Sequence, residues 1–183
     1  MTVVESWRVL AKTPRDGATV LVDPRGFFTS TREEARRWQP AVLALLMVAL
    51  AVGIAAVRLP DGAPDQAWTR LAWLGGVSPL LAAAGVGMGA AVILGAARWL
   101  GGNGTLPDAL RVSAYASVAV PVWAATHGSF FLGSLSVILW VYIVACGMEV
   151  MLGVKRQVVW NLVVALVAVI FVGSAVAGFL EGP

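Results

Sequence analysis

Four long stretches without a charged residue constrain this chain more than any other feature of its sequence. They cover residues 41–57, 71–97, 112–148 and 157–180. An α-helix rises about 1.5 Å per residue and the hydrocarbon core of a bilayer is about 30 Å thick, so about 20 apolar residues suffice to cross it. Because lipid offers the backbone no hydrogen-bond partners, such stretches must be helical. The sequence therefore predicts an all-α, polytopic membrane helical bundle.

The third stretch is too long for a single crossing. As one helix, the 37 residues from 112 to 148 would measure about 55 Å. We expect two helices there, joined by a hairpin near residues 127–129 or 133–134, which hold the only break candidates. This division gives five transmembrane helices, which together form a transmembrane domain at residues 40–183. They lie near residues 41–58, 77–99, 108–126, 132–152 and 158–180.

The distribution of basic residues predicts the orientation of these spans. With the N-terminus inside, eleven of the thirteen Lys and Arg residues fall on the inner side, and only Arg58 and Arg70 fall outside. Basic residues accumulate in the cytoplasmic loops of membrane proteins. A four-span arrangement gives nine against four, which fits less well. We therefore expect a multi-pass protein of the cell membrane with a cytoplasmic N-terminus and an outside C-terminus.

Residues 1–39 form a polar, cytoplasmic tail with apolar insertions. Apolar residues at helical spacing within residues 3–10 predict a short amphipathic helix at the membrane interface. Two overlapping Ser/Thr-x-x-Glu patterns between residues 30 and 34 are typical of capping boxes and predict that a helix starts near Thr31. Pro40 then fits the first turn of the first span, where its missing N–H costs nothing.

The middle of the tail carries a proline-aromatic segment. Asp23 and Pro24 open a predicted turn, because both residue types favour turns. Phe27 and Phe28 follow next to a basic residue, a combination typical of exposed side chains that anchor a protein at the membrane interface. A partner-binding patch is the alternative interpretation of the same pair.

Glycine and proline patterns bear on how the helices pack. Gly85 and Gly89 are four residues apart, which favours close approach of a neighbouring helix. A dinucleotide-binding loop would need a flanking strand, which this apolar segment does not provide. The glycine-rich segment 101–104 is the strongest turn signal, and Thr105 is placed to cap the next helix. Pro121 lies inside the third span and should kink it.

Three residues are candidate functional polar groups. Glu149 is the one ionisable residue inside a predicted span, and charge in lipid is costly, yet pairing with nearby Lys155 or Arg156 is the simpler explanation. His127 is expected at the outer hairpin, as a solvated turn residue or as a pH-sensing group. Tyr115 and the other hydroxyls of the third span either line a polar path or bond between helices, and we favour bonding.

The sequence supplies no catalytic set. No Ser/His/Asp arrangement, phosphate-binding loop or pair of catalytic carboxylates can be assembled, so we expect no enzyme activity and no cofactor. One histidine and one cysteine, Cys146, offer no metal cluster. The basic residues lie at the ends of apolar stretches, where membrane topology explains them better than nucleic-acid binding.

Several motifs occur together in an order that resembles a known family. They are Asp-Pro-Arg-Gly-Phe-Phe at 23–28, Leu-Gly-Gly-Asn-Gly-Thr at 100–105 with Leu-Arg-Val-Ser-Ala-Tyr-Ala at 110–116, Pro121, and Trp140 with Gly147 before the Lys155-Arg156 turn. From about residue 20 to its end, the chain resembles the prokaryotic branch of the Yip domain family of membrane proteins. The motif residues on the cytoplasmic side are Pro24, Phe27, Phe28, Gly101, Gly102 and Arg111.

The resemblance implies a five-span membrane protein but no catalytic residues. Eukaryotic members resemble organisers of vesicle traffic that contact small GTPases of the Rab type. Their cytoplasmic Asp-Leu-Tyr-Gly-Pro signature is absent from this sequence, which puts small GTPase binding in doubt.

The sequence allows three different functions. The first is a non-enzymatic membrane protein that binds or organises other components of the lipid bilayer, with a membrane-protein partner or a second copy as its contact. The second is a small transporter or permease subunit, which Pro121, the hydroxyls of the third span and Glu149 would serve. The third, an intramembrane enzyme, would need several converging polar groups that the sequence does not supply.

Overall fold

The computed structural model describes residues 16–32, 39–58, 78–126 and 130–180, and all regular structure in these ranges is helical. Residues 16–22 are helical, and seven labelled helices follow. They are α2 (Pro24–Thr31), α3 (Gln39–Arg58), α5 (Ser78–Trp99), α6 (Leu106–Ala116), α7 (Ala119–Thr126), α8 (Phe130–Val150) and α9 (Arg156–Leu180). The all-α prediction is confirmed for this part of the chain. The predicted amphipathic helix within residues 3–10 and His127 lie outside it.

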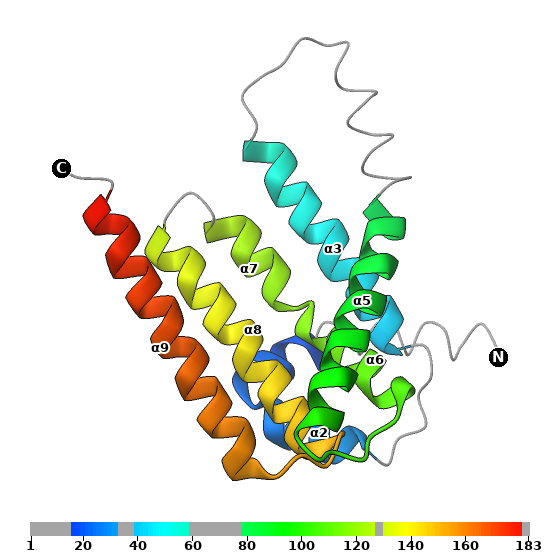
Figure 1. Ribbon diagram of the computed structural model, residues 1–183. Coiled ribbons are helices and arrows are strands. Elements are labelled where there is room, and N and C mark those ends of the chain that lie inside the picture. The colour runs from blue at the N-terminus through cyan, green and yellow to red at the C-terminus, as the bar shows by residue number, and fades with distance from the viewer. Residues whose placement is uncertain (1–15, 33–38, 59–77, 127–129, 181–183) are drawn as a thin grey trace, which may run out of the picture.

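The long helices run in alternating directions along one bundle (Figure 1). α3 packs against α5, α6 and α7, and α5 packs closely against α6. α8 contacts α2, α6, α7 and α9, so it occupies the centre, whereas α9 lies at the edge against α8. The predicted bounds of the first, second, fourth and fifth spans agree with α3, α5, α8 and α9 to within two residues.

Three helices of the described chain are long and apolar enough to cross a membrane. Their apolar windows are Ala82–Trp99 in α5, Gly133–Val150 in α8 and Arg156–Gly173 in α9. By this criterion the described residues contain three such helices rather than the predicted five. In α3 the qualifying apolar part is the shorter Pro40–Ala51. The third predicted span is divided between α6 and α7, and neither alone is long enough for about 30 Å of hydrocarbon.

The division between α6 and α7 lies just before Pro121. Helical structure stops at Ser117 and Val118 and resumes at Ala119. Pro121 has no N–H to donate to the carbonyl of Ser117, and its ring crowds that carbonyl. The N–H of Val120 donates to the Ser117 carbonyl instead, at 2.9 Å. The predicted kink is confirmed, and it takes the form of a break one turn ahead of the proline.

The α5–α6 loop is held against the turn between α8 and α9. The N–H groups of Asn103 and Gly104 both donate to the carbonyl of Leu152, at 3.0 and 3.2 Å. A Cβ atom on Gly104 would lie 2.6 Å from the Cα of Leu152, so this approach requires glycine. Thr105 caps α6 as predicted, and its N–H donates to Oδ2 of Asp108 at 3.0 Å.

The segment after residue 22 is a helix where the sequence predicted a turn. Asp23 is the N-cap of α2, and its Oδ1 accepts a 2.9 Å hydrogen bond from the N–H of Gly26. Pro24 occupies the first turn, where proline is favoured. Thr31 ends this helix, and its hydroxyl donates to the carbonyl of Phe27 at 2.9 Å. Thr31 itself therefore ends a helix and does not start one, and residues 33–38, over which the predicted helix would run, lie outside the described residues.

Candidate functional site

The helix α2 packs into the end of the bundle where α5 and α8 finish and α9 begins (Figure 1). The rings of Phe27 and Phe28 are only 5% and 0% exposed. Both meet Tyr115 of α6 edge to face, with ring centroids 4.7 and 6.0 Å apart. The prediction of exposed interfacial anchors is wrong, because the helical conformation of α2 turns both rings toward the protein. Tyr115 is a structural partner of this aromatic pair.

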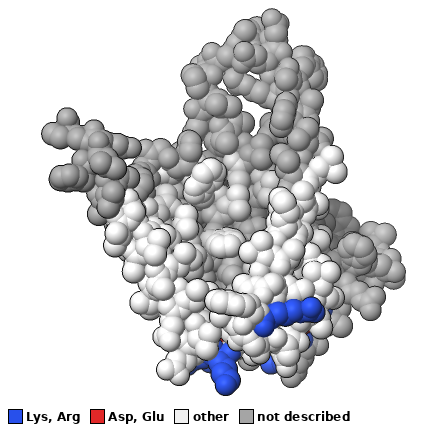
Figure 2. All heavy atoms as spheres, viewed as in Figure 1, with Lys and Arg blue, Asp and Glu red and all other residues white. Residues whose placement is uncertain are grey.

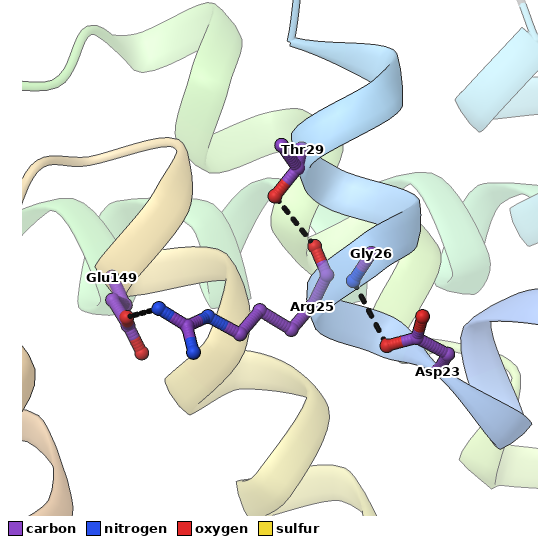
Figure 3. Close-up of polar contacts among 5 residues, drawn as sticks. All are labelled: Asp23, Arg25, Gly26, Thr29 and Glu149. Carbon is purple, nitrogen blue, oxygen red and sulfur yellow. Dashed lines mark hydrogen bonds and ion pairs between the residues drawn. The ribbon is translucent and has the colours of Figure 1, made fainter.

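An ion pair joins α2 to α8 at this end. The guanidinium of Arg25 lies 2.7 Å from Oε1 of Glu149 (Figure 3). The Arg25 side chain is 48% exposed and that of Glu149 is 11% exposed, so water screens one partner and the pair is worth about 1 kcal/mol. The prediction that Glu149 pairs with Lys155 or Arg156 is wrong. Both of those residues lie beyond the turn at Gly153 and are exposed.

Two polar atoms near this end lack a hydrogen-bond partner among the described residues. They are Oε2 of Glu149 and Nε1 of Trp160, and both are buried. Trp160 lies at the start of α9 and its ring meets Tyr142 of α8, with centroids 5.8 Å apart. Glu149 is thus bound through one oxygen only, and its partner comes from α2 and not from a neighbouring residue on α8.

Basic side chains collect at the same end of the molecule. On the face shown in Figure 2, Lys and Arg lie at the lower end and the rest of the described surface is uncharged. Arg98 ends α5, Lys155 and Arg156 begin α9, and all three are exposed. Arg111 is half-buried on α6. This distribution marks one end of the bundle as the electropositive end.

The hydroxyls of α6, α7 and the break between them make structural hydrogen bonds. Ser113 donates to the carbonyl of Val86 on α5 at 2.9 Å, and Thr126 lies 3.0 Å from the hydroxyl of Ser136 on α8. Ser117, which directly follows α6, donates to the carbonyl of Ala114 in α6 at 2.6 Å. The favoured prediction of bonding between helices is confirmed for Ser113 and Thr126.

The glycine stripe of α5 behaves differently at its two positions. A Cβ atom on Gly89 would lie 2.6 Å from Oγ of Ser113, so Gly89 allows α6 to approach closely, as predicted. A Cβ on Gly85 would meet nothing within 4 Å, so Gly85 has no close packing neighbour among the described residues.

Hollows between the helices meet around Trp140 of α8. The larger, of about 310 Å³, lies between α3, α5, α6 and α8 and is lined by Gly85, Gly89, Ser113, Ser117 and Trp140, among others. A second of about 210 Å³ lies between α7 and α8 and shares Val120 and Trp140 with the first. Neither includes Glu149 among its lining residues. No sequence pattern predicts these hollows, because they depend on the distances between whole helices.

The remaining predicted motif residues lie at a helix start or in a tightly packed loop. Pro24 is buried in the first turn of α2, and Gly101 adopts a φ of 82° where α5 ends. Gly102 lies against the carbonyl of Leu152. Within the described ranges, no group of three or more His, Cys, Asp or Glu side chains is placed to hold a metal ion.

The arrangement is that of an integral membrane protein with several apolar helices and an N-terminal helix folded onto one end of the bundle. Residues 18–177 match the Yip1 domain, so the chain belongs to the Yip1 domain family. The match includes α2 and extends almost to the end of α9. Comparison with curated proteins gave no match, and neither did comparison with solved structures.

Proposed function

We propose that this chain is a non-enzymatic membrane protein that binds and organises other components of the bilayer. The observation that supports this most is the set of hollows around Trp140, which the side chains of the described residues leave open. A hollow between helices forfeits dispersion contacts unless another molecule fills it. The surface is therefore suited to receiving a membrane component rather than to converting a substrate.

The proposal includes five membrane crossings. They are the three long apolar helices α5, α8 and α9, the helix α3, and α6 and α7 together as one crossing. The alternating directions of the helices support this arrangement (Figure 1). The exposed basic residues at the ends of α5 and α9 support a cytoplasmic electropositive end, which places the N-terminus inside and the C-terminus outside. Membership of the prokaryotic branch is part of the same proposal, and binding of a small GTPase is not.

Transport is the second candidate, and one observation favours it. Ser113 and Ser117 line the 310 Å³ hollow, as residues of a polar path would. Both hydroxyls already donate to backbone carbonyls, and Glu149 is paired with Arg25 elsewhere. Reconstituted vesicles test this alternative: a solute or proton flux that Glu149→Gln abolishes would establish transport and displace the proposal.

Site-directed photocrosslinking in native membranes tests the main proposal. A photoreactive amino acid at Val137, which lines the hollow beside Trp140, should give a discrete adduct with a lipid, a second copy or another protein. The matched control is Val164 of α9, which is 66% exposed and faces away from these hollows. The same adducts at both positions, or none at Val137, would overturn the proposal.

A further inference from the structure

A third hollow runs between α5 and α9, with α8 as its floor. We call it the α5–α9 crevice; its volume is about 150 Å³, and Trp140 connects it with the hollows described above. Its walls are aliphatic. They include Val92, Ile93 and Ala96 of α5 and Val159, Val163 and Leu166 of α9. The crevice therefore offers an unbranched hydrocarbon chain an apolar surface on three sides.

The crevice extends toward the electropositive end of the bundle. Arg156 precedes Val159 by three residues in the first turn of α9. On α9, residues 156, 159, 163 and 166 have the spacing of one helical stripe, so the basic residue continues the lining of the crevice. Lys155 adds a second exposed cation beside it. Arg98, in the last turn of α5, is two residues from Ala96 and so lies on another face of that helix.

Lys155 and Arg156 have no anionic partner among the described residues. The carboxylates at this end are used elsewhere: Asp23 caps α2, Asp108 caps α6, and Glu149 pairs with Arg25. The face in Figure 2 accordingly shows Lys and Arg at its lower end without Asp or Glu. A ligand with negative charge at this level and a hydrocarbon chain above it would complement both parts of the surface.

A second copy of the chain fits this surface less well. Two copies in one bilayer hold the same residues at the same depth, so docking through the crevice would bring like charges together, which is unfavourable. An anionic lipid brings the opposite charge at the same depth. Basic pockets between transmembrane helices on the cytoplasmic side are a recognised setting for anionic lipid headgroups.

We propose that the α5–α9 crevice binds an anionic phospholipid of the inner leaflet. One acyl chain lies in the crevice toward Trp140, and Lys155 and Arg156 bind the phosphate of the headgroup. This inference rests on the proposed function, since it names the chemistry of one membrane component that the protein holds.

Native mass spectrometry of the full chain in detergent tests the headgroup. The protein is titrated with phosphatidylglycerol and, separately, with phosphatidylcholine of the same acyl chains. We expect preferential binding of phosphatidylglycerol, and each of K155Q and R156Q should weaken it up to about fivefold, as a contribution of about 1 kcal/mol per basic residue implies. The matched control is R32Q, which removes an exposed cation just beyond α2, outside the crevice.

A pair of matched tryptophan variants tests the acyl-chain site. Val92 lines the crevice and is 70% exposed, whereas Val164 is 66% exposed and does not line it. V92W should reduce the retention of phosphatidylglycerol, and V164W should leave it at the wild-type level. Both positions are exposed, so neither substitution disturbs the core.

Several results would overturn this inference. Equal retention of the two lipids, the same loss in R32Q as in R156Q, or wild-type binding by V92W would each do so. A dimer that V92W disrupts, without lipid preference, would assign the crevice to a second copy. A protein adduct at Val137 combined with equal lipid retention would overturn the lipid site while leaving the proposed function in place.

Discussion

The helices α8 and α9 are both strongly apolar, yet they have different surroundings. Of the 18-residue apolar window in α8, 44% is buried inside the protein, compared with 6% of the window in α9. α8 contacts helices on several sides, whereas α9 packs against α8 and turns Val164, Val169 and Phe171 outward. Apolarity therefore shows that a helix is suited to lipid, and it does not show whether the helix meets lipid or protein.

The difference follows from which side chains interrupt the apolar surface. α8 carries Gly147, whose missing side chain leaves room for Val112, and Glu149, which binds Arg25. Small residues and polar contacts drive helix association in lipid, where burial of apolar surface alone gives no advantage. The described part of α9 presents mostly branched aliphatic side chains. Contacts with lipid therefore stabilise this helix as well as contacts with protein would.

The largest effect that would sharpen this comparison is expected at the contact between α2 and the bundle. Phe28→Ala empties a fully buried site and should lower the free energy of unfolding by about 3 kcal/mol. Phe171→Ala on α9, where the side chain is 55% exposed, should change it by less than about 0.5 kcal/mol. Denaturant titration in detergent, followed by circular dichroism, measures both. Equal losses would contradict the contrast between the two surfaces.

A second test compares glycines on the two helices. A Cβ on Gly147 would lie 2.5 Å from Cγ1 of Val112, whereas a Cβ on Gly173 of α9 would meet nothing within 4 Å. Gly147→Leu should therefore overpack the contact with α6 and destabilise the protein by about 2 kcal/mol. Gly173→Leu should be close to neutral. Thermal unfolding in the same detergent decides the matter, and a tolerated Gly147→Leu would show that α6 and α8 can separate without cost.

The smallest effect concerns the ion pair. A double-mutant cycle with Arg25→Gln and Glu149→Gln should give a coupling energy of about 0.5–1 kcal/mol, because Arg25 is half-exposed. Cys146 is the single cysteine and is buried on the α8 face that carries Glu149, so its alkylation rate reports loosening of this face. Either substitution should raise that rate.

Lys155→Gln is the control for the ion pair, since Lys155 is the partner that sequence spacing suggested. It should leave the alkylation rate of Cys146 unchanged. A rise with Lys155→Gln but not with Arg25→Gln would contradict the observed pairing.

The parts of the fold that depend on local chemistry were predictable from sequence. Apolar stretches located α5, α8 and α9, the glycine and serine residues near 127–134 separated α8 from the preceding helix, and Thr105 identified the start of α6. Pro121 located a break, because a missing N–H acts within one turn. Asp23-Pro24 was misread, since the same dipeptide opens a turn or caps a helix.

The contacts of the candidate site could not be predicted in the same way. Arg25 and Glu149 are separated by 124 positions, and nothing in the sequence around Glu149 identifies α2 as its partner. Phe27 and Phe28 carry the same pattern whether they face lipid or Tyr115, and only the packing of α2 decides between these environments. The hollows around Trp140 depend on distances between whole helices, which no local pattern encodes.

The shared carbonyl of Leu152 has a consequence for biogenesis. Asn103 and Gly104 donate to a residue synthesised about fifty positions later, so their N–H groups stay hydrated while the intervening helices are inserted. Closure of this contact joins an early hairpin to a late one and would complete the assembly of the bundle on its electropositive side. A ribosome-stalled chain that ends before Leu152 would therefore leave the glycine loop accessible to protease.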